Sequence, residues 1–231
     1  MVINQFASHG DILFIEPICR RIWENTGEKP ILPVRDHLMW FEHYIDSARF
    51  VPMSEFSLDY DSMAMDNPDY LPLRFANQIV RKLACDDHTD YANMMPDKYL
   101  LSGLPVDLWK NIRINRNPER ENDLFKALNL SPKDQYILIN ENSQAGKISI
   151  IPKRMATDKV IRMSVIEGFT LLDWLGIIEH ARENHHVSTS TFFLMEFLKV
   201  EMPVFMYPRP NNDGLQGISR LNSSFSYTAI A

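Results

Sequence analysis

Short apolar runs alternate with stretches of helical periodicity along most of this 231-residue chain, and this alternation constrains the fold more than any other feature. The run 2–7 precedes a stretch, 12–25, in which apolar residues recur every three or four positions. Two further runs, 30–34 and 49–53, follow, with a helical stretch, 36–44, between them. Strands and helices that alternate with such short connections are typical of βαβ units. We therefore predict an α/β fold built on parallel sheets.

The same pattern begins again in the second half of the chain. Its strand candidates and its apolar-faced helix lie at 135–140, 148–151, 160–165 and 171–181. Between the halves, residues 115–122 contain Pro118 and many charged or amide side chains, which is the composition of a linker. We therefore expect two Rossmann-like α/β domains, residues 1–118 and 119–231, with no sequence repeat between them.

The composition limits the class of protein. A net charge of -6 argues against a protein whose main partner is nucleic acid. No apolar run approaches the ~20 residues needed to cross a bilayer, and the first residues lack the basic region of a signal peptide. Cys19 and Cys85 lie far apart and in no metal-binding spacing, so we expect reduced thiols. The sequence predicts a soluble cytoplasmic protein with no transmembrane segment and no stable nucleic acid binding.

Four consecutive hydroxyl residues, Ser188 to Thr191, connect a strand-like run to an apolar helix, and a second strand-like run, 203–207, follows. Ligands of open α/β sheets bind outside the carboxyl ends of strands, and helix amino ends attract phosphate. The alternative is that Ser188 or Ser190 only caps the helix. Capping and phosphate binding use the same helix end, so these residues alone leave both roles open.

A comparable position in the first half is occupied by His9-Gly10-Asp11. Gly10 would let the backbone turn tightly after the first strand, and Asp11 would then stand at the start of the next helix. A carboxylate in this position could accept a proton from an attacking hydroxyl group. It could equally be an N-cap, and the residues alone leave both roles open.

Several short motifs together resemble the family 9, heptosyltransferase-like glycosyltransferases of the GT-B fold, in a shortened form. They are Gly10-Asp11 with Pro17 six residues later, the strand Tyr136–Asn140 with its Ser/Gly/Lys loop, the segment Gly168–Trp174, and the turn Val187–Ser190. The resemblance implies two Rossmann-like domains that face each other across a cleft. It also implies metal-independent transfer of a sugar from a nucleotide-sugar donor to a glycan or other hydroxyl acceptor, without a cofactor.

The resemblance further implies roles for individual residues. Asp11 matches the residue regarded as the catalytic base of the family. The donor-binding positions lie in the second half: Asn142, Ser143 and Lys147 in the loop that contacts the donor phosphates, Glu167 near the nucleoside ribose, and Ser188, Thr189, Ser190 and Thr191 in the turn. Two positions depart from the family pattern, since Ser188 replaces an acidic residue and Phe193 stands where heptosyltransferases have a His.

Other functions remain open. Asp59 and Asp61 form a D-x-D string of the kind with which metal-dependent GT-A glycosyltransferases hold a divalent cation on a diphosphate. A nucleotide-sugar epimerase would share the two-domain architecture and isomerise the donor without an acceptor. A non-catalytic module that binds nucleotide sugars is a third alternative, which Ser188 supports. His185 and His186 are adjacent on a strand and point to opposite faces, which favours a structural role over metal binding.

Overall fold

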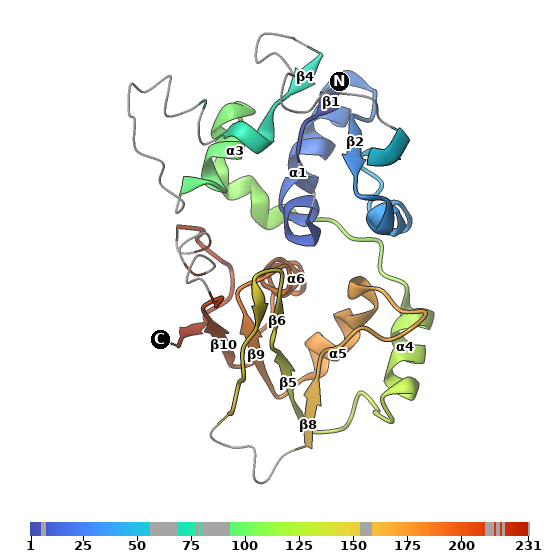
Figure 1. Ribbon diagram of the computed structural model, residues 1–231, viewed down its shortest axis with the longest axis vertical. Helices are drawn as coiled ribbons and strands as arrows, with labels where there is room; N and C mark the ends of the chain where they lie inside the picture. Colours follow the sequence, from blue (N-terminus) through green and yellow to red (C-terminus); the bar gives the residue numbers. More distant parts are fainter. Residues whose placement is uncertain are drawn as a thin grey trace. The chain divides into compact units, whose positions relative to one another are not determined.

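The chain, described here as a computed structural model, divides into two compact α/β units (Figure 1). The first unit comprises Met1–Asn115 with Ser219–Asn222, and the second comprises Arg116–Ile218 with Ser223–Ala231. The structure describes residues 1–5, 8–55, 69–76, 79, 93–152, 159–210, 215, 218 and 220–230. The first boundary falls after Asn115 rather than after 118, and a helix begins at Pro118, inside the stretch that was predicted to be a linker.

The first unit is built on a parallel four-stranded sheet in the order β3-β2-β1-β4. Its strands are β1 (Val2–Ile3), β2 (Ile31–Val34), β3 (Arg49–Pro52) and β4 (Tyr70–Leu71). The chain begins in the interior of the sheet, adds β2 and β3 on one side, and then places β4 on the other side of β1. The strand order therefore reverses between β1 and β4, and the carboxyl ends of strands at such a reversal are where open α/β sheets bind ligands.

The helix α1 (His9–Thr26) follows β1 and buries the whole stretch from Ile12 to Cys19. Gly27 ends the helix in the left-handed conformation, with φ of 75°, which a glycine adopts without a steric penalty. Pro17 lies inside α1 and has no N–H, so one helical hydrogen bond is missing there. Next to this gap the hydroxyl of Tyr99, in helix α3 (Pro96–Leu101), donates to the carbonyl of Phe14 at 2.7 Å and so links α3 to the interrupted turn.

Within the described ranges, the other helical segments of the first unit are short. They are η1 (Asp36–His43), η2 (Met53–Glu55), η3 (Leu73–Phe75), α3 (Pro96–Leu101) and η5 (Val106–Asn111). All but α3 are 3-10 helices, and the expected helix at 36–44 is among them. Short connectors often take this tighter form, since they contain too few residues for a stable α-helix. The string with Asp59 and Asp61 lies outside the described residues.

The second unit is built on a parallel five-stranded sheet in the order β11-β10-β9-β5-β8. Its strands are β5 (Tyr136–Asn140), β8 (Lys159–Arg162), β9 (Glu183–Val187), β10 (Val204–Tyr207) and β11 (Thr228–Ala229). Read from β8, their chain order is 2-1-3-4-5, a common doubly wound arrangement. The order reverses at β5 and β9, so the carboxyl ends of these two strands mark the expected ligand site of this unit.

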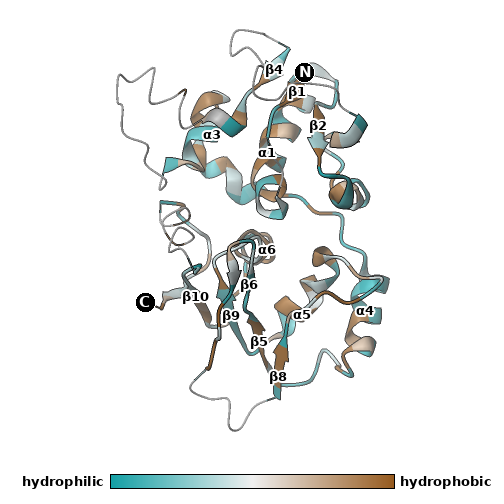
Figure 2. Ribbon diagram, in the orientation of Figure 1, coloured by the Kyte–Doolittle hydropathy of each residue, from teal (hydrophilic) through white to brown (hydrophobic). Residues whose placement is uncertain are grey.

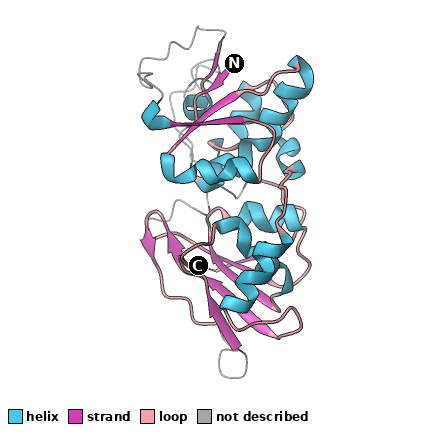
Figure 3. Ribbon diagram, turned by 90° about the vertical axis from the view of Figure 1, so that its right-hand side faces the viewer, coloured by secondary structure: helices cyan, strands magenta, loops and turns pink. Residues whose placement is uncertain are grey.

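Helices cover one face of this sheet, as Figure 3 shows for the second unit. They are α4 (Pro118–Ala127), the 3-10 helix η6 (Leu171–Trp174) with α5 (Leu175–His180), and α6 (Thr191–Leu198). The Tyr136 hydroxyl and the Asn184 amide donate to carbonyls of α5 at 2.8 and 3.2 Å, which ties this helix to the sheet. Arg120 of α4 donates to the buried Asp173 of η6 at 2.9 and 2.7 Å.

The core of the second unit lies around the strand β5. All five residues of β5 are buried, and Figure 2 shows that most of the strand is hydrophobic. On the face opposite α5, the side chains of Ile137, Ile139, Val187 and Ile150 form one cluster. Ile150 belongs to the stretch 148–151, which was expected as a strand but pairs with no other strand. The preceding polar loop is instead a small antiparallel hairpin of β6 (Asn142–Ser143) and β7 (Gly146–Lys147).

Among the described residues, no helix combines the length and the apolar character that crossing a membrane requires.

Candidate functional site

Asp11 lies in the first turn of α1, just beyond the carboxyl end of β1 and therefore at the strand reversal of the first sheet. Ser8, not Asp11, is the N-cap residue, and Asp11 stands three positions later. Gly10 was expected in a tight turn, but it is the second residue of α1. Asp11 nevertheless takes part in the cap as the N3 residue of a capping box, because its carboxylate accepts the Ser8 N–H.

The carboxylate of Asp11 has partners on both oxygens. Its Oδ2 accepts from the hydroxyl of Ser8 at 2.7 Å and from the Ser8 N–H at 3.3 Å. Its Oδ1 accepts from the ammonium of Lys98 on α3 at 2.7 Å. Burial alone would raise the pKa of Asp11, but Lys98 and Ser8 stabilise the ionised form and lower the pKa below its ordinary value. Asp11 is therefore a carboxylate anion at neutral pH.

A cavity of about 500 Å³ opens beside the carboxyl end of β5 in the second unit, within the range of small-molecule sites. It is lined by Glu141, Lys147, Ile148, Ser149 and Arg162. Glu141 is buried and receives a hydrogen bond from the Ile150 N–H at 2.9 Å and a short one from Arg162. Lys147 lies 3.4 Å from the same carboxylate. The cavity wall therefore carries two cations for one carboxylate.

Glu141 remains ionised in this setting. Its burial would raise its pKa, but the Ile150 N–H, Arg162 and Lys147 together lower the pKa below its ordinary value. The net charge of the three side chains is thus positive at neutral pH, which suits an anionic ligand such as a phosphate group.

The predicted donor-binding residues of the hairpin have different environments. Lys147 lines the cavity. The side chain of Asn142 donates to the carbonyl of Met163 at 3.1 Å, and the hydroxyl of Ser143 donates across the hairpin to the carbonyl of Gly146 at 2.7 Å. Both therefore support the local backbone. Glu167 lies in an exposed turn and does not line this cavity.

The turn Ser188–Thr191 joins β9 to α6, as predicted, at the second sheet's strand reversal. Ser190 occupies the N-cap position of α6, yet its side chain makes no capping hydrogen bond. The N–H groups of Thr189, Ser190 and Thr191 meet no acceptor in the described part of the chain. Three adjacent free donors at a helix amino end can receive phosphate oxygens.

Asn140 at the end of β5 links this turn to the cavity side of the sheet. Its amide donates to Thr189 Oγ1 at 3.2 Å, and its Oδ1 accepts from the N–H of Asn142 at 3.2 Å. Arg209, after β10, donates to the Ser188 carbonyl at 2.7 Å and has no carboxylate partner within the described ranges. The turn therefore has a cation nearby that the sequence did not indicate.

The two adjacent histidines of β9 have structural roles. His185 stacks on Phe205 at 4.4 Å and contacts Tyr207 and Glu183, at 3.0 and 3.3 Å. His186 is fully buried, and burial lowers its pKa to about 3. Neither belongs to a group of three potential metal ligands, and the described residues contain no such group.

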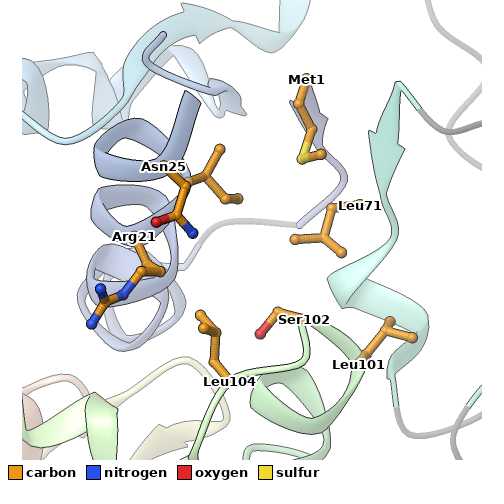
Figure 4. Close-up of a pocket in the computed structure, with 8 residues that line it drawn as sticks. Met1, Arg21, Asn25, Leu71, Leu101, Ser102 and Leu104 are labelled. Carbon is orange, nitrogen blue, oxygen red and sulfur yellow. The ribbon is translucent and has the colours of Figure 1, made fainter. Parts of the chain in front are cut away.

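A second, smaller cavity of about 160 Å³ lies in the first unit (Figure 4). Its walls are Met1, Arg21, Ile22, Asn25, Leu71, Leu101, Ser102 and Leu104. Arg21 and Asn25 lie near the carboxyl end of α1 and Met1 just precedes β1, so the cavity is at the amino edge of the sheet, away from Asp11. Its size and position do not match a substrate site of an α/β sheet.

The sequence did not indicate Lys98, Glu141, Asn140, Arg162 or Arg209. Glu141 and Asn140 could have been found, because polar residues that end a buried strand are the residues expected to contact ligands in this fold. Arg162 ends β8 in the same way. Lys98 carried no signal, since it lies 87 positions from Asp11 and only the fold brings the two together.

The class of protein that this architecture defines is a mixed α/β protein with parallel sheets, of the kind found in GT-B-like glycosyltransferases. No protein-family model and no curated protein matches the sequence. Solved structures match across the chain, and the predicted resemblance to family 9 glycosyltransferases is confirmed for the fold.

Three solved structures illustrate the match. The family 9 glycosyltransferase from Veillonella parvula shares 9% identity at a TM-score of 0.51, with all of this chain and 86% of that chain covered. The ADP-heptose heptosyltransferase II of E. coli shares 7% at a TM-score of 0.50, with 100% and 90% covered. The iron-containing dodecameric glycosyltransferase TibC of enterotoxigenic E. coli shares 12% at 0.52, with 89% of this chain but only 57% of TibC covered. Similarity at these identities establishes the fold alone.

Proposed function

We propose that this protein is a glycosyltransferase that moves a sugar from a nucleotide-sugar donor to an acceptor hydroxyl group, without a metal ion. The observation that carries the proposal is the polar edge of the second sheet. There, a cavity with two cations and a helix amino end with three free N–H groups lie at the carboxyl ends of neighbouring strands. In this fold such an edge is the expected place for a nucleotide.

The two parts of this edge suit the two phosphates of a nucleoside diphosphate. Lys147 and Arg162 would contribute positive charge, and the amides of the turn Ser188–Thr191 would donate hydrogen bonds. When the sugar leaves, negative charge develops on the diphosphate, and fixed cations and dipoles stabilise such charge. This would replace the divalent cation that other glycosyltransferases use. Asp11 would accept the proton of the acceptor hydroxyl.

Donor binding can be tested with nucleoside diphosphates alone. We expect at least one of ADP, GDP and UDP, or a sugar conjugate of it, to raise the melting temperature, since a ligand at 100 times its Kd stabilises by about 2.7 kcal/mol. Charge-assisted hydrogen bonds contribute about 1.5–3 kcal/mol each, so Lys147→Met and Arg162→Met should each weaken binding by roughly 10- to 100-fold. Lys159→Met is the matched control, because Lys159 is exposed and bonds to the carbonyl of Asn129. A panel with no shift would refute the proposal.

One observation favours a second candidate, a protein that binds nucleotide sugars without turning them over. Both oxygens of Asp11 already have partners, as they would in a purely structural carboxylate. The two candidates differ in one result: only a transferase releases the nucleoside diphosphate from a bound donor when an acceptor or water is present.

A further inference from the structure

The ion pair between Lys98 and Asp11 is not needed for helix capping. Ser8 and Asp11 form the capping box of α1, and the two hydrogen bonds from Ser8 to Asp11 Oδ2 are made without Lys98. Lys98 nevertheless reaches Asp11 from α3, and its side chain is only 3% exposed, whereas that of Asp11 is 22% exposed. Burying an ammonium group is unfavourable unless it is paired, so the chain keeps a costly group beside this one carboxylate.

The contacts fix the orientation of the carboxylate and leave part of it available. An ionised carboxylate has roughly four acceptor positions, and the Lys98 ammonium, the Ser8 hydroxyl and the Ser8 N–H occupy three. The remaining position can accept a hydrogen bond from an incoming hydroxyl group. The partial exposure of Asp11 gives such a group a route of approach.

We propose that Lys98 is a positioning residue for Asp11, and that its ammonium holds the carboxylate ionised and in one orientation to receive the proton of the acceptor hydroxyl. This inference rests on the proposed function. In the reaction, the acceptor oxygen forms a bond to the anomeric carbon of the sugar while the bond from that carbon to the phosphate oxygen breaks. The electron pair of the broken bond stays on the nucleoside diphosphate, and the acceptor proton goes to Asp11.

The charges around Asp11 identify Lys98 as the group that controls its ionisation. In the described part of the chain, Lys98 is the only charged group in contact with Asp11. The next carboxylate along α1, Glu16, is paired with Arg20 and the Arg113 N–H. On α3, Asp97 precedes Lys98 and is buried. Loss of the ammonium would therefore raise the pKa of Asp11, because burial would then act with only Ser8 to oppose it.

The experiment measures the pH dependence of kcat/KM for sugar transfer by the full chain and its Lys98→Met variant, together with the Asp11 carboxyl pKa from ¹³C NMR. An opposite charge at this distance shifts a carboxyl pKa by about 1–3 units. We therefore expect both the Asp11 pKa and the acidic limb of kcat/KM to move upward by at least about one unit in Lys98→Met. Lys98→Arg, which keeps the charge, should leave the limb near its wild-type position. Lys110→Met, which removes a surface partner of Asp107, is the control and should change neither quantity.

The outcomes separate this inference from the proposed function. If the Asp11 pKa rises but the acidic limb does not move, the pair is structural and the inference is overturned, while the transferase assignment stands. If the wild-type protein transfers no sugar from any donor it binds, the proposed function fails and this inference fails with it. Should Lys98→Met not fold, Lys98→Gln carries the same prediction, because it also removes the charge and keeps a polar end.

Discussion

The stability of the second unit should depend on pH through one buried imidazole, His186. This side chain lies on β9, two positions before Ser188, with Nε2 3.1 Å from the Asn184 Oδ1 and with Nδ1 buried and without a partner in the described structure. Burial, with a smaller contribution from His185, lowers its pKa from 6.5 to about 3. The folded protein therefore keeps His186 neutral over a range in which the unfolded chain would protonate it.

The sign and size of the effect follow from this difference. Between pH 6.5 and about pH 3 the unfolded state binds one more proton at this residue, so acid favours unfolding. The stability that His186 contributes is present above pH 6.5 and falls by about 1.4 kcal/mol for each pH unit below it. A change from pH 6.5 to pH 4.5 should therefore cost about 2–3 kcal/mol from this residue.

His186→Gln tests the effect, because glutamine can still donate to Asn184 but does not titrate. We would measure the free energy of unfolding by urea titration at half-unit steps from pH 4.5 to pH 7.5. The variant should be less stable than the wild type at neutral pH, yet lose much less stability on acidification. His185, which is also shifted downward by burial, contributes to both proteins and so cancels in the comparison. If the free energy of unfolding fell equally with pH in the wild type and in His186→Gln, the reasoning would be refuted.

Two further predictions concern packing. Gly176→Ala would place a methyl group 2.9 Å from Glu121 Oε2 and 3.0 Å from Phe125, and Arg116 holds Glu121 in place. Overpacking should cost about 1–3 kcal/mol, which exceeds the gain in helix propensity of up to ~1 kcal/mol. Urea titration should therefore show a lower free energy of unfolding, and a more stable variant would contradict the packing. Tyr99→Phe removes the hydrogen bond to the Phe14 carbonyl beside Pro17 and should lower the unfolding free energy by about 1 kcal/mol, whereas an unchanged melting curve would show that this contact adds nothing.

Periodicity in the sequence predicted the elements that are buried over a continuous stretch. β5 is buried along its whole length and α1 over the stretch from Ile12 to Cys19, and both were found close to their predicted bounds. The patterns were less informative where local and tertiary effects compete. The stretch 36–44 has an apolar pattern like that of an α-helix but forms a 3-10 helix, and 148–151 packs into the core without joining the sheet.

The candidate site was predictable in its location but not in its full chemistry. The turn Ser188–Thr191 could be identified from the order of strand, polar loop and helix, whereas Lys147 was implied only by the resemblance to family 9. The pairing of Asp11 with Lys98 could not, because contacts between residues distant in the chain leave no local pattern. Ser188 and Phe193, the two residues that depart from the family 9 pattern, are both buried beside the amino end of α6.

The cleft between the two halves, the metal-independent use of a nucleotide-sugar donor and the localisation in the cytoplasm stay predictions. Substitution of Arg209 or Arg162, with donor affinity measured on each variant, would test donor binding most directly. Each is a cation at the carboxyl edge of the second sheet that the strand–turn–helix pattern did not indicate.

The central claim is that Asp11 acts as the base in sugar transfer while the donor binds in the second unit. The most direct test is the release of nucleoside diphosphate from nucleotide sugars by the wild type and by Asp11→Asn, with donor affinity measured by calorimetry on both. Asparagine can still accept from Ser8, so the start of α1 should stay intact. Loss of a general base should lower turnover by about 10²- to 10⁴-fold while donor affinity stays within a few-fold. Unchanged turnover, or a loss of donor affinity as large as the loss of turnover, would contradict the claim.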